Sequence, residues 1–381
     1  MARIYLDHAA TTPVRPEAVA AMAPLLGAYN PSSLHAEGRA ARTVVDDARA
    51  SVARVLSAAP REIVFTGSGS EADGLALLGA ARALVGSRRH VVTSAIEHPA
   101  VLRAVDMLEG EGWRATRLPV DARGLIDPAA FAAALTPDTV LASIMLANNE
   151  IGVVQPVAEL ARLARARGVL FHTDAVQAAG WLSLDVGALG VDLLSLSAHK
   201  FHGPKGVGIL FVRSGVDVAP LSGGGGQERG LRAGTENVAG IAGLATALAL
   251  AEAERPEASP RVAALRDRLE AAIRAQIPGT IVNGAGAPRL PGILSVAFAD
   301  VPSDALLMRL DLDGIAASAG SACAAGALEP SHVTAALGLD ARYRLGTIRF
   351  SLGRATTEAE IDAVIRRLPE LLADVRTPLT V

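Results

Sequence analysis

The chain has 381 residues, of which 50% are hydrophobic and 20% are charged, and its formal net charge is -3. Disordered chains combine low hydrophobicity with high net charge, so this composition predicts a folded protein with one large and one smaller domain. The acidic balance and the 3% of aromatic residues argue against nucleic-acid binding, which needs a basic face and stacking side chains. A single cysteine excludes a disulfide framework and a cysteine-based structural zinc site.

Two features bear on location. Residues 1–7 include a charge at Asp7 and lack the apolar segment of a signal peptide. The longest apolar stretch, residues 238–251, is too short to span a bilayer and predicts a buried helix. We therefore expect a cytoplasmic protein with no membrane partner and no direct nucleic-acid partner.

Short apolar runs alternate with helical patterns along the chain, which predicts an α/β fold with a mostly parallel sheet. The expected strands are, in chain order, 62–66, 90–94, 140–146, 169–173, 193–197 and 208–212. The expected helices are 70–85, 99–109 and 157–167. The polar, proline-flanked segment 255–260 predicts a domain boundary. Beyond it, strands near 292–299 and 347–352 mix with helices and predict a smaller α+β domain.

A glycine-rich turn follows the first expected strand and leads into a helix, which is a suitable place for a phosphate. Gly67, Gly69 and Ala72 fit the relaxed dinucleotide pattern G-x-G-x-x-A, and Glu97 lies near where a ribose-binding acid belongs. This favours an NAD-dependent oxidoreductase. Alternatively, the turn binds a single phosphate with the Ser70 hydroxyl as an added donor. A capped helix without any ligand explains the same residues.

Two charged residues follow later strands. Asp174 ends one expected strand, and Lys200 follows another and precedes a glycine–proline turn. Ligands of open α/β sheets bind beyond the carboxyl ends of the strands, so the two side chains are expected to converge. Pyridoxal 5'-phosphate needs an amine that forms an imine with its aldehyde. It also needs a carboxylate that keeps its pyridine nitrogen protonated. Taken singly, the lysine is equally explained as an exposed cation and the aspartate as a helix cap. Together with the phosphate turn, they favour pyridoxal phosphate over NAD.

Longer motifs give a specific resemblance. They are YLDHAATTP (5–13), NPSS (30–33), ANNEIG (147–152), SAHK (197–200), GGGQERGLRAGT (224–235), SAGSAC (318–323), LEPSH (328–332) and IRFSLGR (348–354). Over residues 4–366 the chain resembles the long-loop subgroup of the cysteine desulfurases. These are fold-type-I pyridoxal-phosphate enzymes of the class V aminotransferase family.

The resemblance implies a large domain, residues 16–255, with a mostly parallel seven-stranded sheet flanked by helices. It also implies a small α+β domain, residues 256–381, that carries Cys323, and an N-terminal segment, residues 1–15, that packs on the small domain. Three departures stand out. Ser70 replaces the family's usual threonine, and Gly74 replaces its usual asparagine. The stretch AAGA (324–327) lacks the serine or threonine that the family usually has after the cysteine.

The resemblance also assigns roles around the cofactor. Lys200 would bind it covalently, Asp174 would pair with the pyridine nitrogen, and Gln177 would donate to the phenolic oxygen. Asn149 would lie beside the ring, and His98 would stack on it and move protons. Without the motif, a strand-end histidine with its hydrogen bonds satisfied is the preferred explanation of His98. The remaining residues would hold the phosphate: Gly69, Ser70, Ser197, His199 and, from the neighbouring subunit of a homodimer, Thr235.

Cys323 decides the expected reaction. A lone cysteine is most often a small buried residue, but Cys323 lies among Ser, Gly and Ala, which predicts a loop. Arg349 and Asn149 would bind the carboxylate of L-cysteine, and Lys200 would remove the α-proton. The Cys323 thiolate would attack the substrate sulfur, which leaves a persulfide and releases alanine.

The sulfur would then pass to an acceptor or scaffold protein for iron–sulfur cluster assembly or tRNA thiolation. No resident metal is expected, and Cys323 is a candidate transient iron–sulfur ligand. Another class V activity, an aminotransferase or a selenocysteine lyase, remains the alternative. A non-enzymatic scaffold is disfavoured, because both Lys200 and Cys323 are present.

Overall fold

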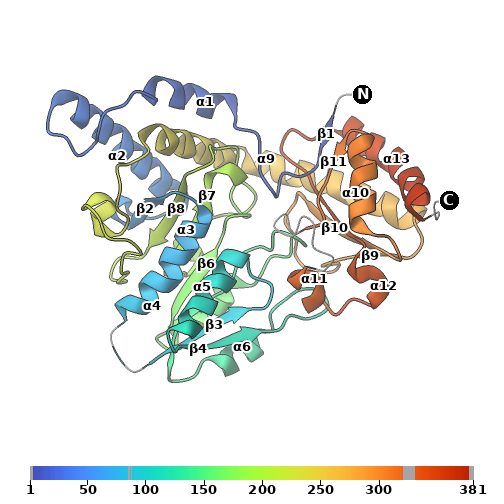
Figure 1. Ribbon diagram of the computed structural model, residues 1–381, viewed down its shortest axis with the longest axis horizontal. Helices are drawn as coiled ribbons and strands as arrows, with labels where there is room; N and C mark the ends of the chain where they lie inside the picture. Colours follow the sequence, from blue (N-terminus) through green and yellow to red (C-terminus); the bar gives the residue numbers. More distant parts are fainter. Residues whose placement is uncertain (1–2, 85, 87, 321–330, 377–381) are drawn as a thin grey trace.

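The computed structural model describes residues 3–84, 86, 88–320 and 331–376. Its larger part is built on a seven-stranded sheet, and a smaller part with a three-stranded sheet lies beside it (Figure 1). The expected α/β fold is confirmed. Among the described helices, none is both long and apolar enough to cross a membrane.

The large sheet has the strand order β2-β8-β7-β6-β5-β3-β4. The strands from β7 to β4 run parallel, whereas β8 pairs antiparallel with both β2 and β7. The bounds are β2 (Ile63–Thr66), β3 (His90–Ser94), β4 (Arg114–Leu118), β5 (Thr139–Ser143), β6 (Leu170–Asp174), β7 (Leu193–Ser197) and β8 (Gly208–Val212). The six expected strands are present, with ends that differ by three residues at most, and β4 is an additional edge strand.

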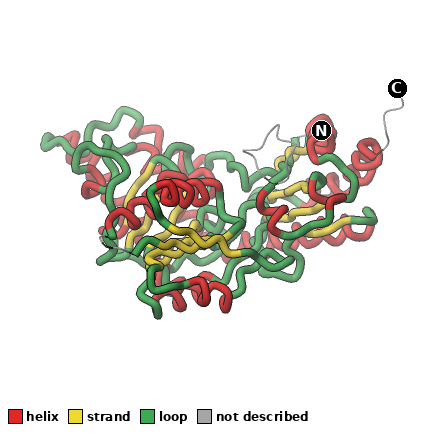
Figure 2. Tube along the Cα trace, turned by 60° about the horizontal axis from the view of Figure 1, so that its bottom comes forward, coloured by secondary structure: helices red, strands yellow, loops and turns green. Residues whose placement is uncertain are grey.

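Helices cover both faces of this sheet, so that the sheet forms the middle layer (Figure 2). On one face, buried residues of α2, α6, α7 and α9 form one hydrophobic cluster, and α3, α4 and α5 form another on the opposite face. The bounds are α1 (Pro16–Met22), α2 (Ala36–Leu56), α3 (Gly69–Gly74), α4 (Ala80–Ala83), α5 (Pro99–Gly110), α6 (Pro128–Ala134), α7 (Val157–Arg165) and α8 (Val186–Leu189). The helix expected over 70–85 is interrupted by a π-helical turn, Leu75–Gly79, between α3 and α4.

The long helix α9 (Val238–Gln276) connects the two parts (Figure 1). Segment 255–260, which its composition predicts as a domain boundary, is helical, with Pro256 and Pro260 inside α9. Buried residues of α9 up to Ala251 pack in the large part, and those from Val262 onward pack in the small part. The domain limits themselves stay a prediction.

The smaller part is a sheet of order β12-β10-β9 with helices packed against it. Its strands include the two expected near 292–299 and 347–352. The bounds are β9 (Thr280–Val282), β10 (Ile293–Phe298), α10 (Ser303–Leu312), α11 (His332–Ala336), α12 (Ala341–Arg344), β12 (Thr347–Ser351) and α13 (Glu358–Arg376). The N-terminal strand β1 (Ile4–Tyr5) pairs in parallel with β11 (Ile315–Ala316), which attaches the start of the chain to this part.

Candidate active site

A pocket with about 1070 Å³ of empty space opens beyond the carboxyl ends of β6 and β7, where the large sheet faces the small one. Ten of the twelve residues singled out in the sequence line it. They are Gly69, Ser70, His98, Asn149, Asp174, Gln177, Ser197, His199, Lys200 and Arg349. The expected convergence at the strand ends is therefore present in the structure.

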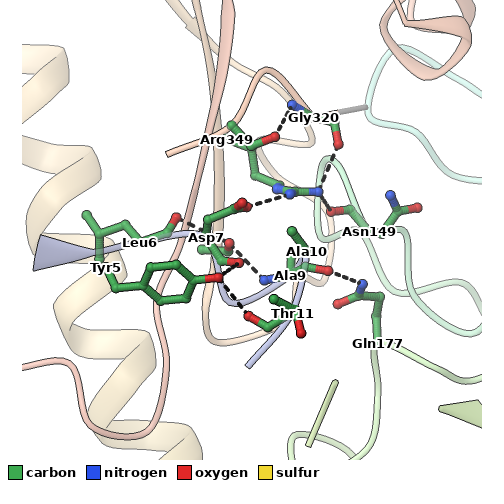
Figure 3. Close-up of polar contacts among 12 residues, drawn as sticks. Tyr5, Leu6, Asp7, Ala9, Ala10, Thr11, Asn149, Gln177, Gly320 and Arg349 are labelled. Carbon is green, nitrogen blue, oxygen red and sulfur yellow. Dashed lines mark hydrogen bonds and ion pairs between the residues drawn. The ribbon is translucent and has the colours of Figure 1, made fainter. Parts of the chain in front are cut away.

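Lys200 ends a short 3₁₀ turn that follows β7. Its Nζ donates to the carbonyl oxygens of Ala9 at 2.6 Å and Ala10 at 2.8 Å. Gln177 Nε2 donates to the same oxygen of Ala9 at 2.9 Å (Figure 3). The N-terminal segment after β1 thus forms one wall of the pocket. In the sequence, the motif of this segment carries the family resemblance but predicts no role for these carbonyl groups.

Asp174 and His98 face the pocket from two strand ends. Asp174 Oδ1 accepts from the backbone N–H of Val176 at 2.9 Å, and burial raises the pKa of the Asp174 carboxyl. His98 precedes α5, and its Nδ1 accepts from the N–H of Ala100 at 3.1 Å, so a neutral ring carries its proton on Nε2. Burial lowers the pKa of His98, which keeps the ring neutral at pH 7.

Asp73 was not expected in the site. It lies on α3, is 1% exposed, and its Oδ1 has no hydrogen-bond partner among the described residues. Burial, and then the charge of Asp174, raise the pKa of Asp73. Ligand atoms of Asp73, His98 and Asp174 lie within 4.8 Å of one another. Two buried acids beside a neutral histidine make a suitable environment for a protonated ring nitrogen.

The turn at the start of α3 lies directly against the end of β7. A Cβ at Gly69 would be 3.0 Å from Ser197 Cβ and 3.0 Å from Val176 Cγ2, so only glycine fits there without a shift. Ser68 Oγ caps the helix by accepting from the N–H of Glu71 at 3.1 Å. The hydroxyls of Ser70 and Ser197 both line the same pocket. A helix start with two hydroxyls suits a phosphate.

Glu97 does not fit the dinucleotide alternative. It is fully buried, and its carboxyl group accepts from Ser94 Oγ at 2.5 Å and from the N–H of Met145 at 3.0 and 3.1 Å. Burial raises the pKa of Glu97 to about 8. Its carboxyl group is engaged inside the protein and does not line the pocket, so the expectation that it binds a ribose is wrong.

Arg349 enters the pocket from β12 in the small sheet (Figure 3). It is 1% exposed, and its Nη1 donates to the carbonyl oxygens of Asn149 at 2.8 Å and Gly320 at 2.9 Å. Its Nη2 contacts Asp7 Oδ1 at 2.8 Å. The pocket therefore has a cationic side built by residues far apart in the sequence.

The two remaining predicted residues are not placed in this pocket. Thr235 is exposed and does not line it. Cys323 lies outside the described residues, so its role stays a prediction. Gly320, the last described residue before that segment, does line the pocket.

Comparison with known proteins identifies the family. The aminotransferase class-V model matches residues 4–364. A cysteine desulfurase IscS of Dictyoglomus turgidum is 44% identical over 376 residues, which cover 98% of this chain and 95% of the relative. A cysteine desulfurase NifS of Azotobacter vinelandii is 46% identical, with 99% and 94% covered. A solved NifS-like protein from Rickettsia africae superposes with a TM-score of 0.88 at 31% identity, with 98% of this chain and 100% of that one covered.

The chain therefore belongs to the class-V aminotransferase family of pyridoxal-phosphate enzymes. Within that family it is a member of the cysteine desulfurases. The residues present suit that cofactor. The pocket is lined by a lysine amine, by two buried acids, one of which has an oxygen with no hydrogen bond among the described residues, and by a helix start with two serine hydroxyls.

Proposed function

We propose that the protein converts L-cysteine to L-alanine and transfers the sulfur atom to Cys323. The observation that carries this proposal is the single pocket in which Lys200 and the buried Asp174 on the large sheet face Arg349 on the small sheet. A lysine and an acid suit the cofactor, and an arginine suits an amino-acid carboxylate.

When bound, pyridoxal phosphate supplies an aldehyde for an amine and a ring that takes up the electron pair left on the substrate's α-carbon. Lys200 Nζ would bind the cofactor and carry the α-proton. The Asp174 carboxylate would hold a proton on the pyridine nitrogen, and Gln177 would donate to the phenolic oxygen. His98, neutral and protonated at Nε2, would cover the ring and exchange protons.

The phosphate would be held by Gly69, Ser70, Ser197 and His199. His199 Nδ1 lies 3.1 Å from Thr11 Oγ1, and burial lowers the pKa of His199 to about 4. The ring is therefore neutral, and it would act on a phosphate as a hydrogen-bond donor.

Arg349 and Asn149 would bind the substrate carboxylate. The bond between the substrate's Cβ and its sulfur breaks, the electron pair stays on carbon, and a new S–S bond forms with the thiolate of Cys323. The β-carbon then takes a proton, and the product leaves as alanine. Sulfur transfer to an acceptor or scaffold protein for iron–sulfur clusters or tRNA thiolation completes the proposed cycle.

The active form would be a homodimer in which Thr235 reaches the partner's phosphate site. Two observations support this. Thr235 is exposed and outside its own chain's pocket. Three large apolar side chains between α1 and α2 are also exposed: Leu26, Tyr29 and Leu34. Exposed apolar groups of this kind are typical of an interface with a second copy.

The test is an absorbance spectrum of the purified protein before and after addition of L-cysteine and a reductant, with alanine and sulfide quantified. We expect a yellow protein whose spectrum changes and which yields both products. A yellow protein that yields neither would contradict the desulfurase activity and favour another class V reaction. A protein that cannot be reconstituted with pyridoxal phosphate would contradict the cofactor as well.

A further inference from the structure

Asp7 contacts the arginine to which the proposed function assigns the substrate carboxylate. We propose that Asp7 is a substrate-exchanged counter-ion: it neutralises Arg349 in the substrate-free enzyme and competes with the carboxylates of L-cysteine and L-alanine for that guanidinium. This inference rests on the proposed function, because it deepens the role of Arg349 in the same pocket. Figure 3 shows the ion pair between the two side chains as a dashed line.

The guanidinium of Arg349 has five N–H groups, and three of them are engaged. Nη1 donates to the carbonyl oxygens of Asn149 and Gly320, and Nη2 to Asp7 Oδ1. Nε has no partner among the described residues. Of the three acceptors, only the Asp7 carboxylate carries a charge, so it is the group that a substrate carboxylate resembles.

The backbone holds Asp7 at this position. β1 pairs with β11, and the N–H of His8 donates to the carbonyl oxygen of Ser351 at 3.1 Å. Tyr5 Oη donates to the carbonyl oxygen of Asp7 at 3.1 Å. The side chain of Asp7 is 21% exposed, whereas that of Arg349 is 2% exposed. The carboxylate can therefore turn toward solvent while its backbone and the arginine stay in place.

A buried cation without a counter-ion is costly, and two carboxylates beside one guanidinium repel each other. Asp7 therefore stabilises the substrate-free protein and opposes substrate binding. After sulfur transfer, L-alanine still carries a carboxylate. The return of Asp7 to Arg349 favours release of that product.

The competing explanation is that Asp7 only holds the guanidinium of Arg349 in its orientation. The two explanations predict opposite changes in amino-acid affinity when Asp7 is replaced. A counter-ion that competes predicts tighter amino-acid binding when its charge is removed. A brace predicts weaker binding, because the guanidinium loses its orientation. Asp7→Asn removes the charge and keeps an oxygen acceptor, and Asp7→Ala removes both.

The experiment titrates the holoenzyme with L-alanine by calorimetry and measures KM and kcat for L-cysteine, with substrate-free melting temperatures for each variant. We expect Asp7→Asn to lower the Kd for L-alanine roughly tenfold and to lower KM, while the melting temperature falls. Asp313→Asn is the matched control. It breaks an Asp–Arg pair with Arg367 outside the pocket (2.7 Å) and should leave Kd and KM unchanged.

An unchanged or higher Kd for L-alanine in both Asp7 variants would overturn the inference. Wild-type enzyme that forms no alanine from L-cysteine would instead contradict the proposed function. An active wild type with unchanged Asp7 variants contradicts the inference alone, so the two failures are distinguishable.

Discussion

The two sides of the pocket balance their charges differently. At the large sheet, the buried acids Asp73 and Asp174 share the pocket with a neutral histidine and Lys200. At the small sheet, the buried guanidinium of Arg349 already has Asp7 as its partner. On the first side, a ligand with a positive ring nitrogen balances the charge of the two acids. On the second side, Asp7 already balances the charge of Arg349, so a ligand carboxylate must displace Asp7 to bind.

The largest effect is expected at Lys200. The sequence contains two lysines, Lys200 in the pocket and the exposed Lys205. Lys200→Ala should abolish covalent cofactor binding and lower kcat by at least about 10³-fold, because no other amine of this kind lines the described pocket. Absorbance spectra and borohydride trapping followed by peptide mapping measure this. Lys205→Ala is the control and should keep both properties, and label found on Lys205 would contradict the assignment.

A smaller and more selective effect is expected on the other side of the pocket. Arg349→Lys keeps the charge and loses the planar fork, so KM for L-cysteine should rise roughly 10- to 100-fold with the cofactor spectrum unchanged. Arg342→Lys, in an exposed pair with Asp300, is the control. A large loss of cofactor binding in Arg349→Lys would contradict the assignment of cofactor and substrate carboxylate to different sides of the pocket.

The buried histidine of the large sheet predicts a pH dependence. His172 is fully buried, its ring nitrogens contact Ser143 Oγ at 2.8 Å and Ser195 Oγ at 3.0 Å, and burial lowers the pKa of His172 to about 3. Below pH 6.5 the unfolded chain binds a proton that the folded chain refuses, so this contribution to stability is lost as pH falls from 6.5 toward 3.

His172→Gln removes the imidazole, so unfolding of the variant no longer takes up this proton. Between pH 7 and pH 5.5, wild type should lose about 1 kcal/mol more unfolding free energy than the variant, measured by urea denaturation. Equal losses would contradict a neutral His172. Should the variant not fold, an NMR titration of wild type gives the same answer, and a His172 ring that is protonated at pH 5.5 is the contrary result.

The smallest effect is expected at Gly74, next to Asp73. Its backbone is helical (φ -59°, ψ -46°), and an added Cβ would lie 3.5 Å from Leu221 Cδ1, an ordinary contact. Gly74→Ala should therefore raise stability by about 0.4–1 kcal/mol without changing cofactor affinity. Thermal unfolding measures this, and a lower melting temperature would contradict it.

Much of the large sheet could be predicted from the sequence, because its strands are buried on both faces and appear as continuous apolar runs. β3, β7 and β8 have the predicted bounds. The edge strand β4 has the sequence RATRL, is buried only at Leu118 and has no such run. The composition of segment 255–260 predicted a domain boundary but not its helical structure. α9 continues through Pro256 and Pro260, and its two ends pack in different parts of the protein.

The residues of the site also differ in how far they could be predicted from the sequence. Asp174 and Lys200 could be predicted to converge, because parallel strands end at one edge. Asp7 and Arg349 are 342 residues apart, and the pairing of β1 with β11 and the bridge between Asp7 and Ser351 bring them together. No local pattern contains that contact. Asp73 was missed because a polar residue in a predicted helix is ordinarily exposed.

The most direct measurement is mass spectrometry of the peptide that contains Cys323, after the holoenzyme has reacted with L-cysteine without a reductant or an acceptor. We predict that this peptide carries one additional sulfur atom and that one alanine is released for each sulfur bound. Cys323→Ala should keep the cofactor spectrum and bind no sulfur. Alanine formed at the wild-type rate by Cys323→Ala, or an unmodified Cys323 peptide in an active enzyme, would contradict sulfur transfer to this residue.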